Sequence, residues 1–339
     1  MGRFTCFAPT CARSRWSGLP ATTSTSTGGG PTPASNTSSA NGALLAARPR
    51  HGLVRLWTKI REVESAALAR VLGCRYVVPL REGGSLPAVV DTDADGSFVV
   101  KFRGAGQGPK ALVAEVLVAL IAQALDLPVP RPVVVDLEDG FGRSEPDPEI
   151  QDILRGSVGA NFGLEFLHGA LAYDPAVDDG LLTPEVAADI VWLDAYVTNV
   201  DRTARNTNLL VSGQHVWLID HGAALFFHHR WTGWQQRIQS PFPQIAEHVL
   251  LSRAGDLEAA DARLRPRLDP TRMAAIVESV PEEWLGDEPE FVDVSQQREA
   301  YLTYFVERLN GPRAWLKEAI AAQQRGPATL QRRMTHRVV

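Results

Sequence analysis

The sequence predicts an α+β protein of two lobes: a small β-rich N-terminal lobe with one helix and a mostly helical C-terminal lobe. Short valine-rich runs between turn-forming clusters occupy the first part of the chain, and longer helix-forming runs occupy the second. Strands that precede helices are typical of α+β folds, whereas parallel α/β sheets show alternation. The 339 residues suffice for two packed regions with a cleft between them.

The composition is ordinary for a soluble globular protein, with 45% apolar and 22% charged residues. The net charge of -5 gives no reason to expect nucleic acid as a partner, because a phosphate-binding surface is typically basic. No apolar run approaches the roughly 20 residues of a membrane helix. Cys6, Cys11 and Cys74 lack CxxC spacing, which argues against a zinc site and a disulfide framework. We therefore expect a cytoplasmic protein without nucleic acid or membrane as a partner.

The N-terminal segment differs in composition from the rest of the chain. Residues 1–50 are rich in Ser, Thr, Gly, Pro and Asn, and the first acidic residue is Glu62. Such a segment cannot bury enough apolar surface to fold, so we expect a disordered tail or a start codon assigned too far upstream. A targeting peptide is a weaker alternative, because no compact apolar core is present. We expect the N-terminal lobe over 51–160, the C-terminal lobe over 161–325 and a tail over 326–339.

Strand and turn patterns define the predicted N-terminal lobe. Valine-rich runs over 75–80, 87–91 and 97–102 are separated by the turn clusters "REGGS" and "TDADG". The run 109–127 predicts a helix that opens with Pro109, and its apolar residues lie nearly all round, which indicates burial. A further strand is expected at "VPRPVVVDL", toward a sheet edge because of its prolines.

Helical patterns dominate the second part of the chain. After a polar loop over 138–157 with one helical turn, a helix over 183–199 begins with Thr183 as its predicted N-cap. "TNLLV" and "VWLID", joined by "SGQH", predict a β-hairpin. The remaining helices are expected over 242–254, 256–268, 270–280 and 296–324.

Three small residues lie in the first turn between strands. Gly83, Gly84 and Ser85 form either a simple hairpin turn or a flexible loop whose backbone N–H groups approach phosphate oxygens. The loop is neither a GxGxxG nor a Walker A motif.

One lysine and one glutamate stand out in apolar surroundings. Lys101 lies in "VVKF", and Glu115 is the only acid in the body of the following helix. Each has a simple explanation as a surface residue. If instead they are buried, they must pair. A lysine held by a glutamate beside a glycine-containing loop could bind the α- and β-phosphates of a nucleotide.

Two polar clusters flank the predicted hairpin. Asp201 precedes Asn206 by five residues in "VTNVDRTARNTNLLV", and Asp220 ends "VWLID". The loop alone resembles an ordinary Asx-rich turn. Phosphoryl transfer, however, requires a carboxylate that accepts a proton, a neutral oxygen for magnesium, and a second carboxylate that binds the metal. Asn208 is an alternative metal ligand, with less suitable spacing. Gly222 would give the backbone freedom to turn after Asp220.

Two arginines lie between Asp201 and Asn206. Arg202 and Arg205 could hold phosphate or substrate, although such arginines are more commonly solvated or cap a loop.

The order of these features resembles the HipA-like kinases, a bacterial family with a two-lobed protein-kinase-like fold. The resemblance spans roughly Arg75 to His229. "DRTARN" is similar to the family's D-x4-N catalytic loop, "IDHG" to its magnesium-binding D-x-G, "VVKF" to its lysine strand and "GPKALVAEVLVALIA" to the helix with the paired acid. "NFGLEFLHGAL" occupies the position between the lobes, where backbone groups would bind adenine. The short phosphate loop favours a small subgroup of uncertain substrate, and toxin activity does not follow.

The resemblance implies an ATP- and magnesium-dependent phosphotransferase that acts on a hydroxyl of a protein or small molecule. A nucleotide-binding pseudokinase that serves as a regulatory module is one alternative, and a metal-dependent hydrolase using Asp201 and Asp220 is another. The presence of all four polar positions favours an active kinase. In this interpretation Asp201 is the catalytic base. Asn206 and Asp220 bind the metal, and the nucleotide residues are Gly83, Gly84, Ser85, Lys101 and Glu115.

Overall fold

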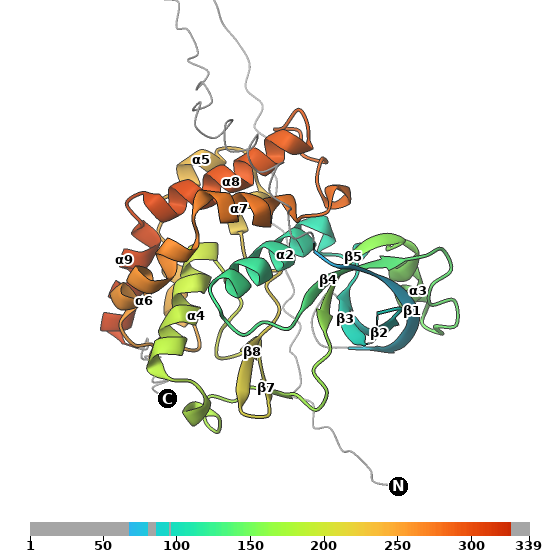
Figure 1. Ribbon diagram of the computed structural model, residues 1–339, viewed down its shortest axis with the longest axis horizontal. Coiled ribbons are helices and arrows are strands. Elements are labelled where there is room, and N and C mark those ends of the chain that lie inside the picture. The colour runs from blue at the N-terminus through green and yellow to red at the C-terminus, as the bar shows by residue number, and fades with distance from the viewer. Residues whose placement is uncertain (1–67, 81–85, 95, 327–339) are drawn as a thin grey trace, which may run out of the picture. The chain divides into compact units, whose positions relative to one another are not determined.

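The computed structural model describes residues 68–80, 86–94 and 96–326 (Figure 1). These residues all belong to one compact unit of the chain, Pro49–Val339. The expected tail over residues 1–50 and the turn of Gly83, Gly84 and Ser85 lie outside the described residues. Among the residues that are described, no helix combines the length and apolar character needed to cross a membrane.

Five strands of the described chain close into a barrel, seen at the right of Figure 1. Their order is β1-β2-β3-β5-β4, and all pairs are antiparallel except β1 with β4. The strands are β1 Arg70–Pro79, β2 Ala88–Thr92, β3 Ser97–Lys101, β4 Pro132–Leu137 and β5 Gly159–Glu165. Valine side chains of alternating positions fill the barrel interior, as the pattern of the sequence predicts.

The expected edge position of the strand over 129–137 is wrong. β4 is paired on both sides, with β1 and with β5. Its prolines do not prevent this, because Pro130 precedes the strand and Pro132 is its first residue. Neither position removes an N–H from the middle of the ladder.

Helix α2, Gly108–Ala124, lies between the barrel and the helical part of the chain (Figure 1). It is buried along nearly its whole length, which explains its apolar residues on all faces. Pro109 is the second residue of the helix, where a missing N–H is still tolerated. Its two ends are tied to the helical part: Lys110 pairs with Glu288 at 2.6 Å, and Arg267 donates to the Leu125 carbonyl at 2.7 Å.

A short helix lies between two barrel strands in the chain, and a small three-stranded sheet follows the barrel. The polar loop after β4 contains α3, Pro148–Arg155, which is longer than the single turn expected and is capped by Asp147. β6 Leu171–Ala172, β7 Leu209–Ser212 and β8 His215–Leu218 form an antiparallel sheet in the order β6-β7-β8. The predicted hairpin of β7 and β8 is thereby confirmed.

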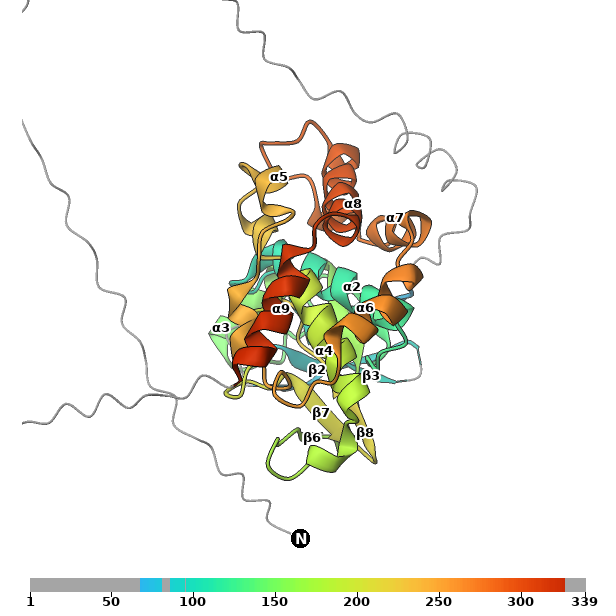
Figure 2. The same cartoon turned by 90° about the vertical axis from the view of Figure 1, so that its left-hand side faces the viewer.

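Helix α4, Pro184–Val197, begins at the predicted N-cap, where the Thr183 hydroxyl accepts from the Val186 N–H at 3.2 Å. Figure 2 shows α4 beside α6 and α9, and side chains of these helices form the core with aromatic contacts such as Trp192 on Trp315. The other helices are α5 Trp234–Arg237, α6 Leu257–Leu264, α7 Pro270–Glu278, α8 Val294–Asn310 and α9 Ala314–Arg325. Short 3-10 turns are η1 Asp179–Leu181, η2 Phe226–His229, η3 Pro243–Glu247, η4 Arg265–Arg267 and η5 Glu282–Trp284.

Two helix predictions for this part are wrong in extent. The run 242–254 contains only η3, followed by hydrogen-bonded turns. The run 296–324 divides into α8 and α9, because Gly311 and Pro312 interrupt it.

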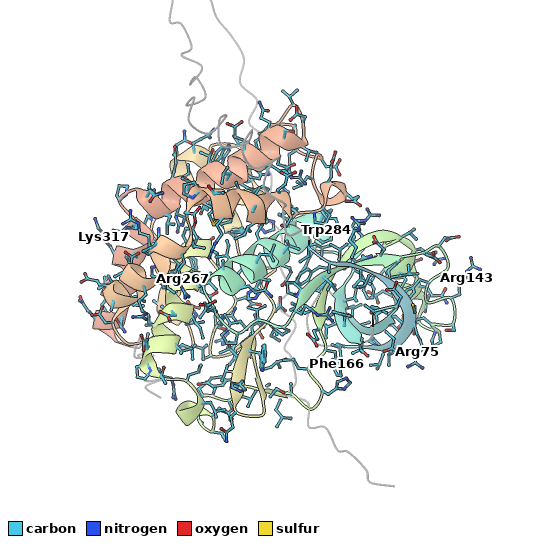
Figure 3. All side chains as sticks on the ribbon, in the orientation of Figure 1. Arg75, Arg143, Phe166, Arg267, Trp284 and Lys317 are labelled. Carbon is cyan, nitrogen blue, oxygen red and sulfur yellow. The ribbon has the colours of Figure 1, made fainter. Side chains whose placement is uncertain are left out.

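A tryptophan joins the helical part to the barrel. Trp284 is buried, and its indole N–H donates to the Ala160 carbonyl of β5 at 3.0 Å (Figure 3). β5 continues to Glu165, so the segment that leaves the barrel begins at Phe166 (Figure 3). The Phe166 N–H donates to the Ser97 carbonyl at 2.9 Å. The expected boundary at residue 160 therefore falls inside a barrel strand.

Candidate active site

Lys101, the last residue of β3, contacts two carboxylates. Its Nζ lies 2.5 Å from Glu115 Oε1 on α2 and 2.5 Å from Asp220 Oδ1 after β8. The second oxygen of Glu115 accepts from the His221 N–H at 2.9 Å. The expected Lys101–Glu115 contact is thus present in the structure. Through this pair, a barrel strand, the buried helix and the end of the hairpin meet at one point.

The charges of this cluster follow from its burial. Burial lowers the pKa of Lys101, but Glu115 and Asp220 outweigh it and raise the pKa above its usual value. Burial raises the pKa of Asp220, and Lys101 more than reverses this. Burial also raises the pKa of Glu115, and there Lys101 compensates only in part. We take Glu115 as ionised at neutral pH, because each of its oxygens accepts from an N–H donor.

Asp220 is the most exposed of the three charged residues in this cluster. Its side chain is 39% exposed, whereas that of Lys101 is 9% exposed and that of Glu115 is fully buried. The backbone of Asp220 is left-handed, with φ 54°, a conformation that aspartate tolerates better than most residues. Backbone strain of this kind concentrates at functional sites.

Gly222 serves close approach and not backbone freedom. Its φ is not in the left-handed region, in contrast to the expectation from the sequence. A Cβ at this position would lie 3.1 Å from Glu115 Oε1 and 3.6 Å from the Ala111 side chain. A side chain at this position would crowd Glu115, so glycine lets the segment after Asp220 pack closely on α2.

Asp201 lies in a loop that closes on its own side chains. Asp201 Oδ2 accepts from Asn206 Nδ2 at 2.8 Å and from Asn208 Nδ2 at 3.3 Å. The Thr203 N–H donates to the carbonyls of Asp201 and Asn206 at 3.0 and 2.9 Å. Asp201 Oδ1 has no hydrogen-bond partner among the residues that the structure describes. One carboxylate oxygen is thus held, and the other is available to accept a proton.

Hydrogen bonds join this loop to the end of β8. The Ile219 N–H donates to the Asn208 carbonyl at 3.1 Å. Arg202 donates to the same carbonyl and to that of Ile219, the second at 3.4 Å. The residue after Asp201 and the residue before Asp220 are therefore joined by a hydrogen bond, so the two backbone segments that carry these acidic residues are held together.

Arg202 lies inside the protein and donates to a backbone carbonyl of its own loop, as expected of an arginine that caps a loop. It is 1% exposed and binds Asp194 Oδ2 on α4 through its Nε at 2.6 Å. Hence it is neither solvated nor available to a substrate phosphate. Asp194, His221 and His248 complete this buried network. The sequence did not single out Asp194 or His248. A single aspartate near the end of an apolar helix was the one local signal for Asp194.

Comparisons with known proteins identify the family of this chain. A protein-family model described as HipA-like kinase matches residues 76–318. The chain belongs to the HipA-like kinase family. The family's name indicates a kinase-type phosphotransferase. No curated protein matches the sequence of this HipA-like kinase.

Among solved structures, the chain is similar to the Helicobacter pylori proinflammatory kinase CtkA. The identity is 12%, the match covers 75% of this chain and 98% of CtkA, and the TM-score is 0.46.

Proposed function

We propose that this HipA-like kinase is ATP- and magnesium-dependent and transfers the γ-phosphoryl group to a hydroxyl of a protein or small molecule. The observation that carries the proposal is the joint placement of Lys101 between Glu115 and Asp220, with the Asp201 loop hydrogen-bonded to the residue before Asp220. Each of these groups has a distinct task in phosphoryl transfer.

Lys101 and Glu115 are proposed to hold the nucleotide. Because Lys101 keeps its charge and is fixed by Glu115, its ammonium can neutralise phosphate oxygens at the end of β3. Gly83, Gly84 and Ser85, which lie outside the described residues, are proposed to cover the phosphates with backbone N–H groups. The lobes are proposed to meet at the segment after Glu165, with the adenine beside it.

Asn206 and Asp220 are proposed to hold magnesium. Asn206 Nδ2 donates to Asp201. The amide oxygen of Asn206, Oδ1, has no hydrogen-bond partner among the described residues. Asp220 offers an ionised and partly exposed carboxylate. Amide and carboxylate oxygens are suitable magnesium ligands, and the metal usually takes further oxygens from phosphate and water.

Asp201 is proposed as the catalytic base. Its Oδ1 would accept the proton of the acceptor hydroxyl as the acceptor oxygen bonds to the γ-phosphorus. The bond from that phosphorus to the bridging oxygen breaks, and the nucleoside diphosphate leaves. A bound magnesium ion would withdraw charge from the phosphate oxygens. Asn206 and Asn208 orient Asp201 by holding its Oδ2.

The location of the protein stays a prediction. The cysteine pattern favours the cytoplasm.

The experiment is transfer of label from γ-labelled ATP with magnesium, first to the protein itself and then to proteins and small molecules of a lysate. We expect transfer that stops when EDTA removes the metal and returns when magnesium is restored. Nucleotide binding without any transfer would contradict the proposal and support the pseudokinase alternative. Transfer that persists in EDTA would contradict the magnesium requirement.

A further inference from the structure

Asp194, near the end of α4, is a fully buried carboxylate that accepts three hydrogen bonds. Its Oδ2 accepts from Arg202 Nε at 2.6 Å and from His248 Nε2 at 2.8 Å, and its Oδ1 accepts from Asn199 Nδ2 at 2.9 Å. Burial raises the pKa of Asp194, but Arg202 and His248 reverse this and hold the pKa below its ordinary value. The residue is therefore a permanent anion.

Two routes lead from Asp194 to the proposed base. On one side, Asn199 Oδ1 accepts from the Asp201 N–H at 3.1 Å. On the other side, Arg202 follows Asp201 directly and is fixed through its Nε. Asn199, which precedes Asp201, and Arg202, which follows it, both bind the Asp194 carboxylate. Asp194 thus fixes the chain on both sides of Asp201.

Arg202 extends the same anchor to the neighbourhood of Asp220. Its Nη1 donates to the carbonyls of Asn208 and Ile219, and its Nη2 lies 3.3 Å from His221 Nδ1. A guanidinium only donates, so His221 Nδ1 is the acceptor. Asp220 lies between Ile219 and His221. Its backbone is therefore flanked on both sides by partners of Arg202.

His248 is contributed by the segment that follows η3. The Leu250 N–H donates to His248 Nδ1 at 3.1 Å, so that His248 carries its proton on Nε2 and donates it to Asp194. The Val249 N–H donates to the Arg202 carbonyl at 3.0 Å. This segment therefore supports the loop from a third direction, through a side chain and a backbone bond.

We propose that Asp194 and His248 are positioning residues for phosphoryl transfer, which hold Arg202 so that Asp201 and Asp220 keep one mutual arrangement. This inference rests on the proposed function. A shared anchor matters because transfer requires the base and the metal-binding carboxylate to act on the same phosphoryl group. Arg202 is satisfied inside the protein, and the loop needs no external phosphate to hold this arginine.

Asp194→Asn is the first test. An amide has one acceptor oxygen, so its NH2 group would face at least one of the three donors that the carboxylate binds. We expect kcat to fall by about tenfold or more, while the Kd of the magnesium nucleotide changes by less than about twofold. His248→Leu removes one donor and should act in the same direction. His248→Gln can donate through its amide and should restore most of the rate.

Asp261→Asn is the matched control. Asp261 on α6 is also a buried carboxylate, which accepts from Trp192 Nε1 at 3.0 Å and pairs with Arg313, away from the catalytic loop. We expect this variant to lose a comparable amount of thermal stability and to keep its kcat. Equal loss of kcat in Asp194→Asn and Asp261→Asn, or full kcat in Asp194→Asn, would overturn the proposal. If Asp194→Asn does not fold, the difference between His248→Leu and His248→Gln decides.

Hydrogen exchange separates this inference from the proposed function. Amides of residues 199–208 should exchange faster in Asp194→Asn than in the wild type, and at the wild-type rate in Asp261→Asn. If the variants show these exchange rates but the wild-type protein has no transfer activity, the anchor is supported and the proposed function is contradicted. Unchanged exchange of this loop in Asp194→Asn would overturn the anchor itself.

Discussion

Asn206 and Asn208 contact the same oxygen of Asp201 but differ in backbone conformation. Asn208 has φ 47°, in the left-handed region that favours asparagine and glycine, and its carbonyl accepts from Ile219. Asn206 is exposed and its φ is not in that region. The structure thus gives a conformational reason for Asn208. The amide of Asn206 remains the better candidate for a metal ligand.

A paired substitution tests this difference between the two asparagines. We expect Asn206→Ala to raise the magnesium concentration for half-maximal transfer by about tenfold or more. Asn208→Gly suits the left-handed backbone and should shift that concentration by less than about threefold. Magnesium titration of the initial rate gives both values. The opposite ranking would assign the ligand to Asn208.

At the residue scale, the sequence predicts local spacing well and distant partners poorly. The D-x4-N loop lies in one turn, so its internal hydrogen bonds follow from six consecutive positions. The burial of Arg202 does not follow, because its partner Asp194, and His248 as the second partner of that carboxylate oxygen, lie on other elements. An arginine in a polar loop has the same local pattern whether it is solvated or buried.

At the scale of elements, the segment after Asp220 is held by aromatic packing. Phe227 in η2 stacks on Tyr304 of α8, with ring centroids 3.5 Å apart. His228 is fully buried beside it, and its Nδ1 lies 3.0 Å from the Tyr301 hydroxyl. Burial lowers the pKa of His228 well below its ordinary value. The imidazole is therefore neutral in the folded protein at neutral pH.

This burial predicts how stability depends on pH. Below pH about 6.5 the unfolded chain protonates His228 and the folded protein does not, so the free energy of unfolding falls as pH falls. Replacement by Gln removes that contribution, and the loss between pH 6.5 and 5 should be smaller by about 2 kcal/mol than in the wild type. Urea unfolding at several pH values measures this difference. Parallel pH profiles of the two proteins would show that His228 is protonated in the folded state.

The predictions of helices and strands agree with the structure where the sequence has turn residues or a helix-capping pattern. The hairpin of β7 and β8 and the start of α4 at Thr183 follow from turn residues and a capping pattern. The short extent of η3 does not follow, because helix-forming composition continues through a segment that the fold bends. The separation of α8 from α9 does have a local signal in Gly311 and Pro312, which the expected single helix over 296–324 overlooks.

At the scale of the whole molecule, the order of strands and helices predicts the α+β class but not the closure of the barrel. Closure depends on parallel pairing of Arg70–Leu72 with Val134–Asp136, two segments far apart in sequence. Likewise, the apolar residues of α2 indicate burial without naming its neighbours. The ties from Lys110 to Glu288 and from Arg267 to Leu125 fix this helix, and with it Glu115, against the helical part.

The most direct test of the account separates nucleotide binding from transfer in two isosteric variants. Asn tolerates the left-handed backbone of Asp220, so Asp220→Asn changes charge without adding strain. We predict that Asp220→Asn weakens magnesium-dependent ATP binding by about tenfold or more. Asp201→Asn should keep the Kd within about twofold and slow transfer by about a hundredfold or more. Full transfer by Asp201→Asn, or wild-type magnesium-dependent binding by Asp220→Asn, would contradict the roles proposed for this site.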